Sequence, residues 1–170
     1  METNSIHTIK KYPDPVLKKR SEEIKAIDDE IKSLTKEMVL LMEKEKGVGL
    51  AAPQVGVLRR LIVFESGKGV IALINPKIAQ KSKEKFSDLE GCLSFPDLWV
   101  KIRRPKKILL EALNLEGQTV QIEAEGMAAR VIQHEIDHLN GTLLLDKMNL
   151  IQRWKARNII GKMKRNYGSC

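Results

Sequence analysis

The sequence is poor in aromatic residues and in cysteine. Phe, Trp and Tyr make up 4% of the 170 residues, too few for the stacking platforms with which single-strand nucleic-acid binders hold bases. The only two cysteines are Cys92 in mid-chain and Cys170 at the last position, where a thiol is a poor partner for a structural disulfide. We therefore expect a reducing compartment and a Cys92 thiol that is free for chemistry.

Long apolar runs are lacking as well. Runs such as 61–64 and 143–145 are far too short to cross a bilayer, and the first residues include no apolar stretch of signal-peptide type. These absences predict a cytoplasmic protein that does not contact a membrane. The length and an ordinary composition, with 42% hydrophobic and 31% charged residues, predict a single catalytic domain over residues 1–170.

Positive charge is in excess, with a formal net charge of +8. Such an excess favours association with a polyanion, but the lysines are scattered through the sequence rather than gathered in one tract. A solvated basic surface is the simpler interpretation. The densest basic group lies near the C-terminus and comprises Arg153, Lys155, Arg157, Lys162, Lys164 and Arg165.

Hydrophobic periodicity predicts helices near both ends of the chain and strands between them. After Asp28, apolar residues recur at steps of three and four until Gly47, which is typical of an amphipathic helix. The pair Asn75–Pro76 is expected to interrupt the strands. Further helices are expected at 127–139 and, with a ragged apolar face, at about 149–165. The predicted fold class is α+β, with strands at 61–64, 70–74, 77–86, 98–102, 108–115 and 119–124.

Residues 134–138 read His-Glu-Ile-Asp-His and fall within the helix predicted at 127–139. Helical positions four apart lie one turn apart on the same side, so His134 and His138 can reach one cation. Glu135 points in another direction, which suits a group that handles the protons of metal-bound water rather than a ligand. The motif therefore predicts metal-assisted hydrolysis.

A hydrolytic site of this kind needs a third protein ligand, so that the fourth position stays open to water. His7 is isolated in the sequence. Cys92 stands in the turn-like segment 90–96 (EGCLSFP), where we expect Gly91 to allow close backbone approach and Pro96 to end the strand geometry. A thiolate there would complete a Cys-His-His set. Alternatively, Cys92 is a small buried hydrophobic residue.

A third segment, 47–56 (GVGLAAPQVG), alternates small with apolar residues and presents one amide side chain, Gln54. One interpretation is a tight glycine turn after the first helix. A phosphate cradle is excluded, because neither phosphate-binding glycine pattern is present and a strand rather than a helix follows. The small residues suit a backbone that passes along a substrate, with Gln54 donating a hydrogen bond.

Together, the three segments resemble the peptide deformylase family. Its pattern joins G-x-G-x-A-A-x-Q, E-G-C-x-S and Q-H-E-x-D-H, which occur here in that order at 47–54, 90–94 and 133–138. The opening residues 11–17 (KYPDPVL) are similar to the family's usual start. The resemblance implies antiparallel β-sheets around a central helix that carries residues 134–138, with an N-terminal amphipathic helix and a C-terminal helix.

The resemblance also implies an activity, the removal of the formyl group from the N-terminal formylmethionine of newly synthesised proteins, with release of formate. One divalent metal ion per chain is expected, with Fe(II) as the family's preferred ion. Zinc, nickel or cobalt would also suit a thiolate with two imidazoles, whereas magnesium and calcium would not. The metal ligands that the resemblance implies are Cys92, His134 and His138.

The resemblance gives roles to three further catalytic groups. Glu135 acts as general acid and base while metal-bound water attacks the formyl carbon, and Gln54 with the backbone N–H of Leu93 binds the oxyanion. An alternative is a zinc peptidase built on residues 134–138 alone, but it would need another His or Glu as third ligand and would leave Cys92 without a role.

Further contacts are expected around this centre. The candidate substrate-binding residues are Val48, Gly49 and Val131; Val131 shares the helix face of His134 and, with Val48, could form the apolar pocket for methionine. Glu90 is expected to hold the Cys92 turn through Arg103 or Arg104. The implied partners are N-formylmethionyl nascent polypeptides. The basic C-terminal helix is a candidate ribosome contact, unless Trp154 anchors it to the core.

Overall fold

The computed structural model describes residues 7–168, so Cys170 lies outside the described range. Among these residues, no helix combines the length and the apolar character that a bilayer crossing requires. The elements in chain order are η1 (Pro15–Lys18), α1 (Asp29–Lys44), β1 (Gly49–Ala51), η2 (Ala52–Val55), β2 (Leu61–Glu65), β3 (Val70–Lys81), β4 (Lys85–Cys92), β5 (Phe95–Pro105), β6 (Lys107–Leu113), β7 (Thr119–Glu125), α2 (Gly126–Leu139), η3 (Leu144–Lys147) and α3 (Leu150–Tyr167), where η marks short 3-10 helices.

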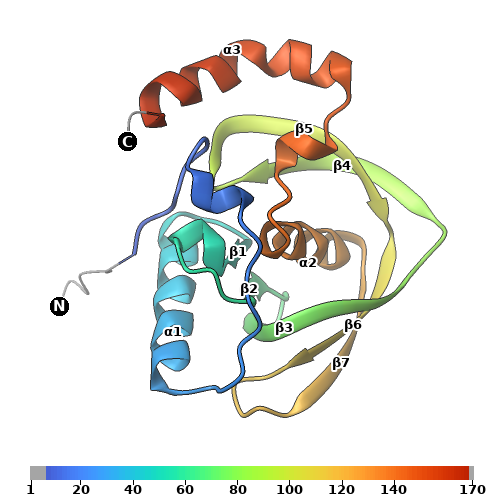
Figure 1. Ribbon diagram of the computed structural model, residues 1–170. Coiled ribbons are helices and arrows are strands. Elements are labelled where there is room, and N and C mark those ends of the chain that lie inside the picture. Colours follow the sequence, from blue (N-terminus) through green and yellow to red (C-terminus); the bar gives the residue numbers. More distant parts are fainter. Residues whose placement is uncertain (1–6, 169–170) are drawn as a thin grey trace.

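Two antiparallel sheets lie on either side of α2 (Figure 1). The larger sheet has the strand order β1-β2-β3-β6-β7, and β4 and β5 form a separate two-stranded sheet. Helix α2 contacts strands of both sheets and includes residues 134–138. The expected α+β fold, with antiparallel sheets around this helix, is therefore confirmed.

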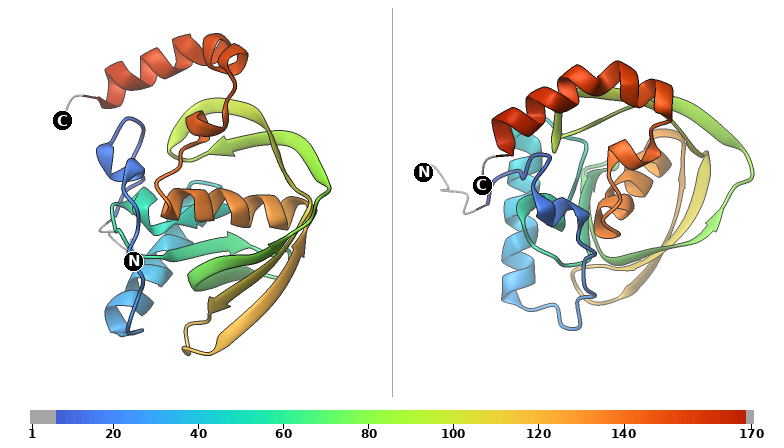
Figure 2. Two further views of the ribbon diagram at one scale, coloured as in Figure 1. Left: turned by 45° about the vertical axis from the view of Figure 1, so that its right-hand side comes forward. Right: turned by 45° about the horizontal axis from the view of Figure 1, so that its top comes forward.

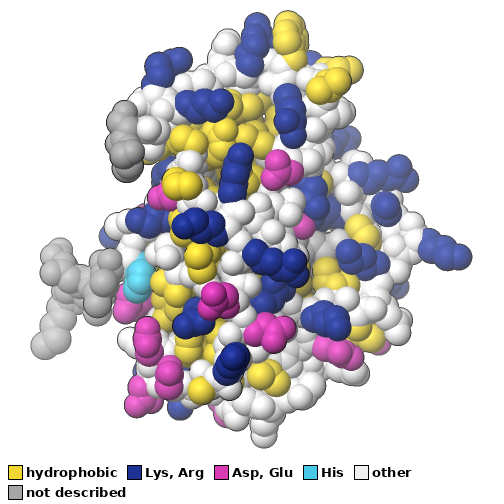
Figure 3. Space-filling view, in the orientation of Figure 1, with side chains coloured by type: hydrophobic (Ala, Val, Ile, Leu, Met, Phe, Trp, Pro, Cys, Tyr) yellow, Lys and Arg dark blue, Asp and Glu magenta, His cyan; other side chains and the backbone are white. Residues whose placement is uncertain are grey.

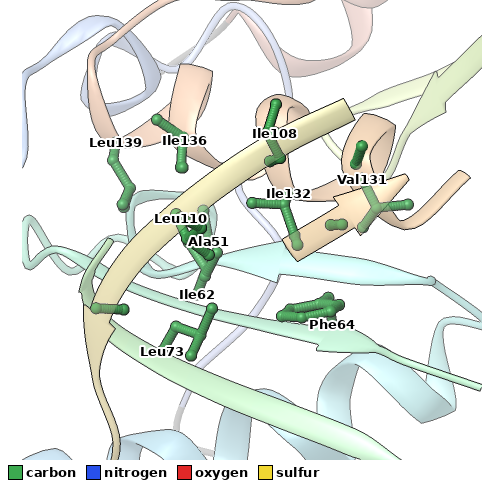
Figure 4. Close-up of a cluster of buried hydrophobic side chains, with 13 residues drawn as sticks. Ala51, Ile62, Phe64, Leu73, Ile108, Leu110, Val131, Ile132, Ile136 and Leu139 are labelled. Atoms are coloured by element: carbon green, nitrogen blue, oxygen red, sulfur yellow. The ribbon is translucent and has the colours of Figure 1, made fainter. Parts of the chain in front are cut away.

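Strand β2 shows how the larger sheet is buried on both faces. Its side chains alternate between the two faces, as in any β-strand. Ile62 and Phe64 pack toward α2 with Ile132 and Ile136 (Figure 4). Leu61 and Val63, on the opposite face, belong to the cluster that contains the apolar side of α1. The short apolar run thus forms a strand between two helices.

Helix α1 begins as the sequence predicts. The Asp28 side chain accepts a hydrogen bond from the Ile31 N–H at 3.0 Å, which satisfies one of the free donors at the helix start. The end differs slightly from the expectation, because the residue with left-handed φ is Lys46, at 56°, rather than Gly47. Gly47 instead lies so close to Leu93 that a Cβ there would be 2.8 Å from the Leu93 Cδ1.

Two prolines expected to end strands lie inside them. Asn75–Pro76 falls within β3 at a register shift between Ile74 and Lys77, where Asn75 has a φ of 51°. Such a bulge leaves a residue outside the ladder, so the N–H that proline lacks is not needed. Pro96 is the second residue of β5, which belongs to a two-stranded sheet whose strands are both edges. The turn of this hairpin is Leu93–Ser94.

Helix α3 lies across β5 (Figure 2). Its buried residues are Ala156 and Met163. The sequence offers Ile151, Trp154, Ile160 and Met163 as its apolar members. Met163 is buried and Ile160 half-buried, whereas Ile151 and Trp154 are 67% and 63% exposed, so the prediction is wrong for these two and Trp154 does not anchor the helix to the core. The helix begins at Leu150, directly after Asn149, whose side chain caps it by accepting a hydrogen bond from the Gln152 N–H.

Candidate active site

Cys92, His134 and His138 converge on one point, although they come from different elements. Cys92 ends β4, while both histidines lie on α2. The Cys92 Sγ is 3.2 Å from the His138 Nε2, which is in turn 3.2 Å from the His134 Nε2. All three ligand atoms lie within 4.8 Å of one another. His7 lies elsewhere and contacts Glu37 of α1 at 2.8 Å.

The donor atoms fit a transition-metal ion. With metal–nitrogen bonds of about 2.1 Å and metal–sulfur bonds of about 2.3 Å, a tetrahedral ion keeps its ligand atoms roughly 3.5 Å apart. Burial lowers the pKa of His134, but Cys92 and Glu90 outweigh burial and raise that pKa well above its usual value. The same pocket lowers the pKa of His138 through burial and the charge on His134. His134 is therefore the imidazole that binds a proton more readily, and His138 is the one that stays neutral.

Glu90 contacts His134 on the side of its ring that faces away from Cys92 and His138. Its buried carboxylate accepts hydrogen bonds from the Arg104 guanidinium and from the Arg130 Nη1, the latter at 2.6 Å. The His134 Nδ1 lies 3.1 Å from the Glu90 Oε2. Burial raises the pKa of Glu90, but Arg104 and His134 more than offset this and bring it to about 2. A permanent carboxylate thus fixes the His134 ring, with Arg104 rather than the exposed Arg103 as its partner.

Glu135 follows His134 on α2 but is not one of the three converging side chains. It is 4% exposed, and burial raises its pKa to about 7. Its Oε2 is buried and has no hydrogen-bond partner among residues 7–168. A carboxyl group with a pKa near neutrality can both accept and return a proton, which is the property of a general acid and base.

The Gln54 side chain is oriented by the residue that directly precedes its 3-10 helix, Ala51. Its Oε1 accepts a hydrogen bond from the Ala51 N–H at 2.9 Å, so the donating NH₂ group faces the other way. That group donates to the Ser94 Oγ at 3.2 Å and lies 3.5 Å from the Cys92 Sγ. The amide donor predicted from the sequence is therefore beside the thiol.

A polypeptide deformylase family model matches residues 6–154 of the chain. The chain belongs to this family. A peptide deformylase of Thermodesulfovibrio yellowstonii is 45% identical over 154 residues, which cover 88% of this chain and 93% of that protein.

Solved structures agree with this family membership. The structure of the Plasmodium falciparum peptide deformylase has a TM-score of 0.91 at 38% identity, covering 95% of this chain and 98% of that one. The structure of the Thermotoga maritima enzyme has a TM-score of 0.82 at 44% identity, covering 84% and 97%.

In this deformylase, a pocket of about 620 Å³ opens beside Cys92 and His134. Val48, Gly49 and Val131, the residues predicted to bind substrate, all line it. So do six further residues to which the sequence gave a role, namely Gln54, Glu90, Cys92, Leu93, His134 and Glu135, together with Phe95, Trp99, Met127 and Arg130. His138 is buried beside Cys92 and His134.

The pocket has an apolar rim. Four of its lining side chains are large, hydrophobic and more than half exposed, namely Val48, Leu89, Trp99 and Met127. Phe95 is instead 1% exposed and stacks on Tyr12, so of the two aromatic residues only Trp99 shapes the rim. Lys11, the first residue of the family-like opening segment 11–17, also lines the pocket, although the sequence assigned it no role in the site.

The absence of a side chain at Gly49 leaves room for the Glu135 carboxylate. A Cβ on Gly49 would collide with the Glu135 Oε1 and would lie 2.8 Å from the Val131 Cγ1. We expect Gly49→Ala to push Glu135 out of position and to lower kcat by about 10²-fold, the usual effect of a 1 Å misplacement of a catalytic group. Steady-state formate release, measured alongside metal content, checks this. The control is Gly161→Ala in α3, where an added Cβ would meet only the Arg165 Nη1, at an ordinary contact distance of 3.5 Å; equal rates for both variants would contradict the prediction.

Proposed function

We propose that this deformylase is a metal-dependent hydrolase that removes the formyl group from N-formylmethionyl nascent polypeptides and releases formate. The observation that carries the proposal is the convergence of Cys92, His134 and His138 beside the buried Glu135. We further propose that residues 1–170 act as one catalytic domain in the cytoplasm.

Cys92, His134 and His138 would hold one divalent ion, and Fe(II) is the ion we propose. When bound, such an ion lowers the pKa of a coordinated water from near 16 toward roughly 7. Zinc, nickel and cobalt also suit the donor set of one sulfur and two nitrogens. Among the described residues, no second group of three His, Cys, Asp or Glu side chains gathers in this way. The alternative zinc peptidase therefore lacks another third ligand.

Other residues of the pocket carry the remaining catalytic and substrate-binding roles. Glu135 accepts a proton from the attacking water and returns it to the leaving amine. The Gln54 amide and the Leu93 N–H donate to the formyl oxygen as negative charge grows on it, and loss of one such donor typically costs about 3 kcal/mol of transition-state stabilisation. Val48 and Val131 bind the methionine side chain, while the backbone at Gly49 passes along the substrate.

The test is formate release from a formyl-Met peptide by protein purified without oxygen, together with metal content per chain. We expect turnover with about one iron per chain, loss of activity in air as the centre oxidises, and recovery with nickel. Cleavage of internal peptide bonds without formate release would favour the peptidase. Absence of both activities in a protein with one bound metal would contradict both functions.

We also propose that α3 docks the enzyme on the ribosome. Over α3, at the top of Figure 3, hydrophobic side chains lie among Lys and Arg side chains. Leu150, Ile151 and Trp154 are all more than 60% exposed. Contact with RNA phosphates by the neighbouring cations would make binding depend on salt.

A chain truncated after Leu150 is expected to bind ribosomes at least tenfold more weakly at low salt, because it loses the basic residues of α3. Activity on a short formyl peptide should remain, since none of the pocket residues lies in α3. Co-sedimentation with ribosomes over a salt series measures the binding. Unchanged sedimentation by the truncated chain would refute the docking role.

A further inference from the structure

Three successive residues near the N-terminus tie together the two elements that carry the proposed oxyanion donors. The Lys10 N–H donates to the Gln54 carbonyl oxygen at 2.7 Å, and the Tyr12 N–H donates to the Ser94 carbonyl oxygen at 2.9 Å. Between them, the Lys11 Nζ donates to the Leu93 carbonyl oxygen at 2.6 Å. This segment, blue in Figure 1, therefore links η2 to the turn of the β4–β5 hairpin.

Of these three bonds, only that of Lys11 depends on the side chain. Any residue except proline could supply the two backbone bonds. The Lys11 side chain is half-buried and lines the catalytic pocket. Within residues 7–168, no carboxylate lies in ion-pairing distance of its Nζ. The ammonium group is thus directed to a backbone carbonyl rather than to an acidic side chain, and a charged donor makes such a hydrogen bond stronger.

We propose that Lys11 is a positioning residue for deformylation. Its ammonium fixes the peptide plane between Leu93 and Ser94, which directly follows the peptide whose N–H is the proposed oxyanion donor. Tyr12 holds the next carbonyl, that of Ser94, so Lys11 is the residue that holds the Leu93 carbonyl itself. By holding the Leu93 carbonyl, Lys11 keeps the Leu93 N–H at a fixed direction relative to Cys92 and Gln54. This inference rests on the proposed function.

The Lys11 ammonium has a second effect on the same step. It adds a positive charge at the edge of a partly buried pocket, where negative charge grows on the formyl oxygen during attack. Both effects are stronger in the transition state than in the bound substrate, so they raise kcat more than they lower KM. A lysine that only stabilised the fold would affect the unfolding temperature and the metal content instead.

The test compares Lys11→Met and Lys11→Arg with the unmodified holoenzyme on a formyl-Met peptide. Lys11→Met is expected to lower kcat about tenfold, less than direct loss of an oxyanion donor, with KM changed by less than about twofold. Metal content should remain at one ion per chain. Lys11→Arg keeps a cationic donor for the Leu93 carbonyl and should recover most of the lost kcat. Lys36→Met, on the exposed side of α1, makes the same change of charge and serves as control.

The outcomes separate this inference from the proposed function. If the unmodified enzyme releases no formate, the proposed function fails, whatever the variants do. If it is active and Lys11→Met keeps its kcat, the positioning role is overturned. The role is also overturned if kcat falls only in proportion to metal content, or if Lys36→Met loses as much activity as Lys11→Met.

Discussion

Glu135→Gln is expected to lower kcat for formate release by about 10²–10⁴-fold, the usual contribution of a positioned general acid and base. Gln has nearly the same shape, but it cannot accept the proton of the attacking water or return it to the leaving amine. The ligand atoms on Cys92, His134 and His138 are untouched, so the metal content should stay at one ion per chain. Steady-state kinetics and elemental analysis of the same preparation measure the two quantities.

The stability of the metal-free protein provides a second readout for this substitution. Folding raises the Glu135 pKa to about 7, so the folded state binds this proton more tightly than the unfolded state does. Its contribution to stability therefore declines as pH rises from the unfolded pKa through 7, and the ionised carboxylate destabilises the fold above that. Glu135→Gln should raise Tm at pH 8 relative to the unmodified protein, and much less at pH 5.

The control for both readouts is Glu123→Gln, at an exposed position of β7. It removes one carboxylate from the surface and should change neither kcat nor the pH dependence of Tm. Turnover by Glu135→Gln at the rate of the unmodified enzyme would contradict the general acid and base role. Loss of metal along with activity would instead place Glu135 among the groups that hold the ion.

Parts of this site are fixed by local geometry and were predictable. Spacing of four residues on α2 brings His134 and His138 together in any helix. The position of Cys92 was not predictable in this way, because it depends on how the β4–β5 hairpin packs over α2, 42 residues farther along the chain at His134. The need for a third ligand made Cys92 a candidate, and the resemblance to the family favoured that role over a small buried hydrophobic residue. The contact of Lys11 with Leu93 joins residues 82 apart in sequence, and although both lie in segments that resemble the family, neither segment indicates that they meet.

The partner of Glu90 could have been chosen from the sequence. Leu98, Val100 and Ile102 alternate along β5 and are all buried, and the next position in this alternation is Arg104. A strand that continues its alternation places Arg104 inward and Arg103 outward. The buried face of α3, by contrast, depends on contacts with β5. The ragged apolar pattern of the helix alone was therefore insufficient to identify that face. The two prolines were misread because a bulge and an edge strand, which are both tertiary features, accommodate them.

Cys92→Ala is expected to abolish stoichiometric metal binding and, with it, formate release. The thiolate supplies one of three protein ligands and the only negative charge among the ligand atoms, so two neutral imidazoles alone would bind a dication far more weakly. Because metal that binds only the folded state stabilises it, the variant should also lose the increase in Tm that added nickel gives the unmodified protein. Elemental analysis after dialysis and thermal unfolding with and without nickel measure both effects.

Cys170→Ala removes the other thiol and is the matched control, with metal content and activity expected to remain. Cys92 is only partly buried and also packs against a buried hydrophobic cluster that joins β5 to α3 and includes Val100, Ala156 and Met163. The same substitution therefore tests the alternative interpretation of Cys92 as a small hydrophobic residue. In that case Cys92→Ala would cost some stability but keep full metal occupancy. Full occupancy would then require a third ligand other than Cys92, although no other His, Cys, Asp or Glu side chain of residues 7–168 joins the two histidines in one cluster. Loss of metal in Cys92→Ala alone would assign the thiolate to the ion.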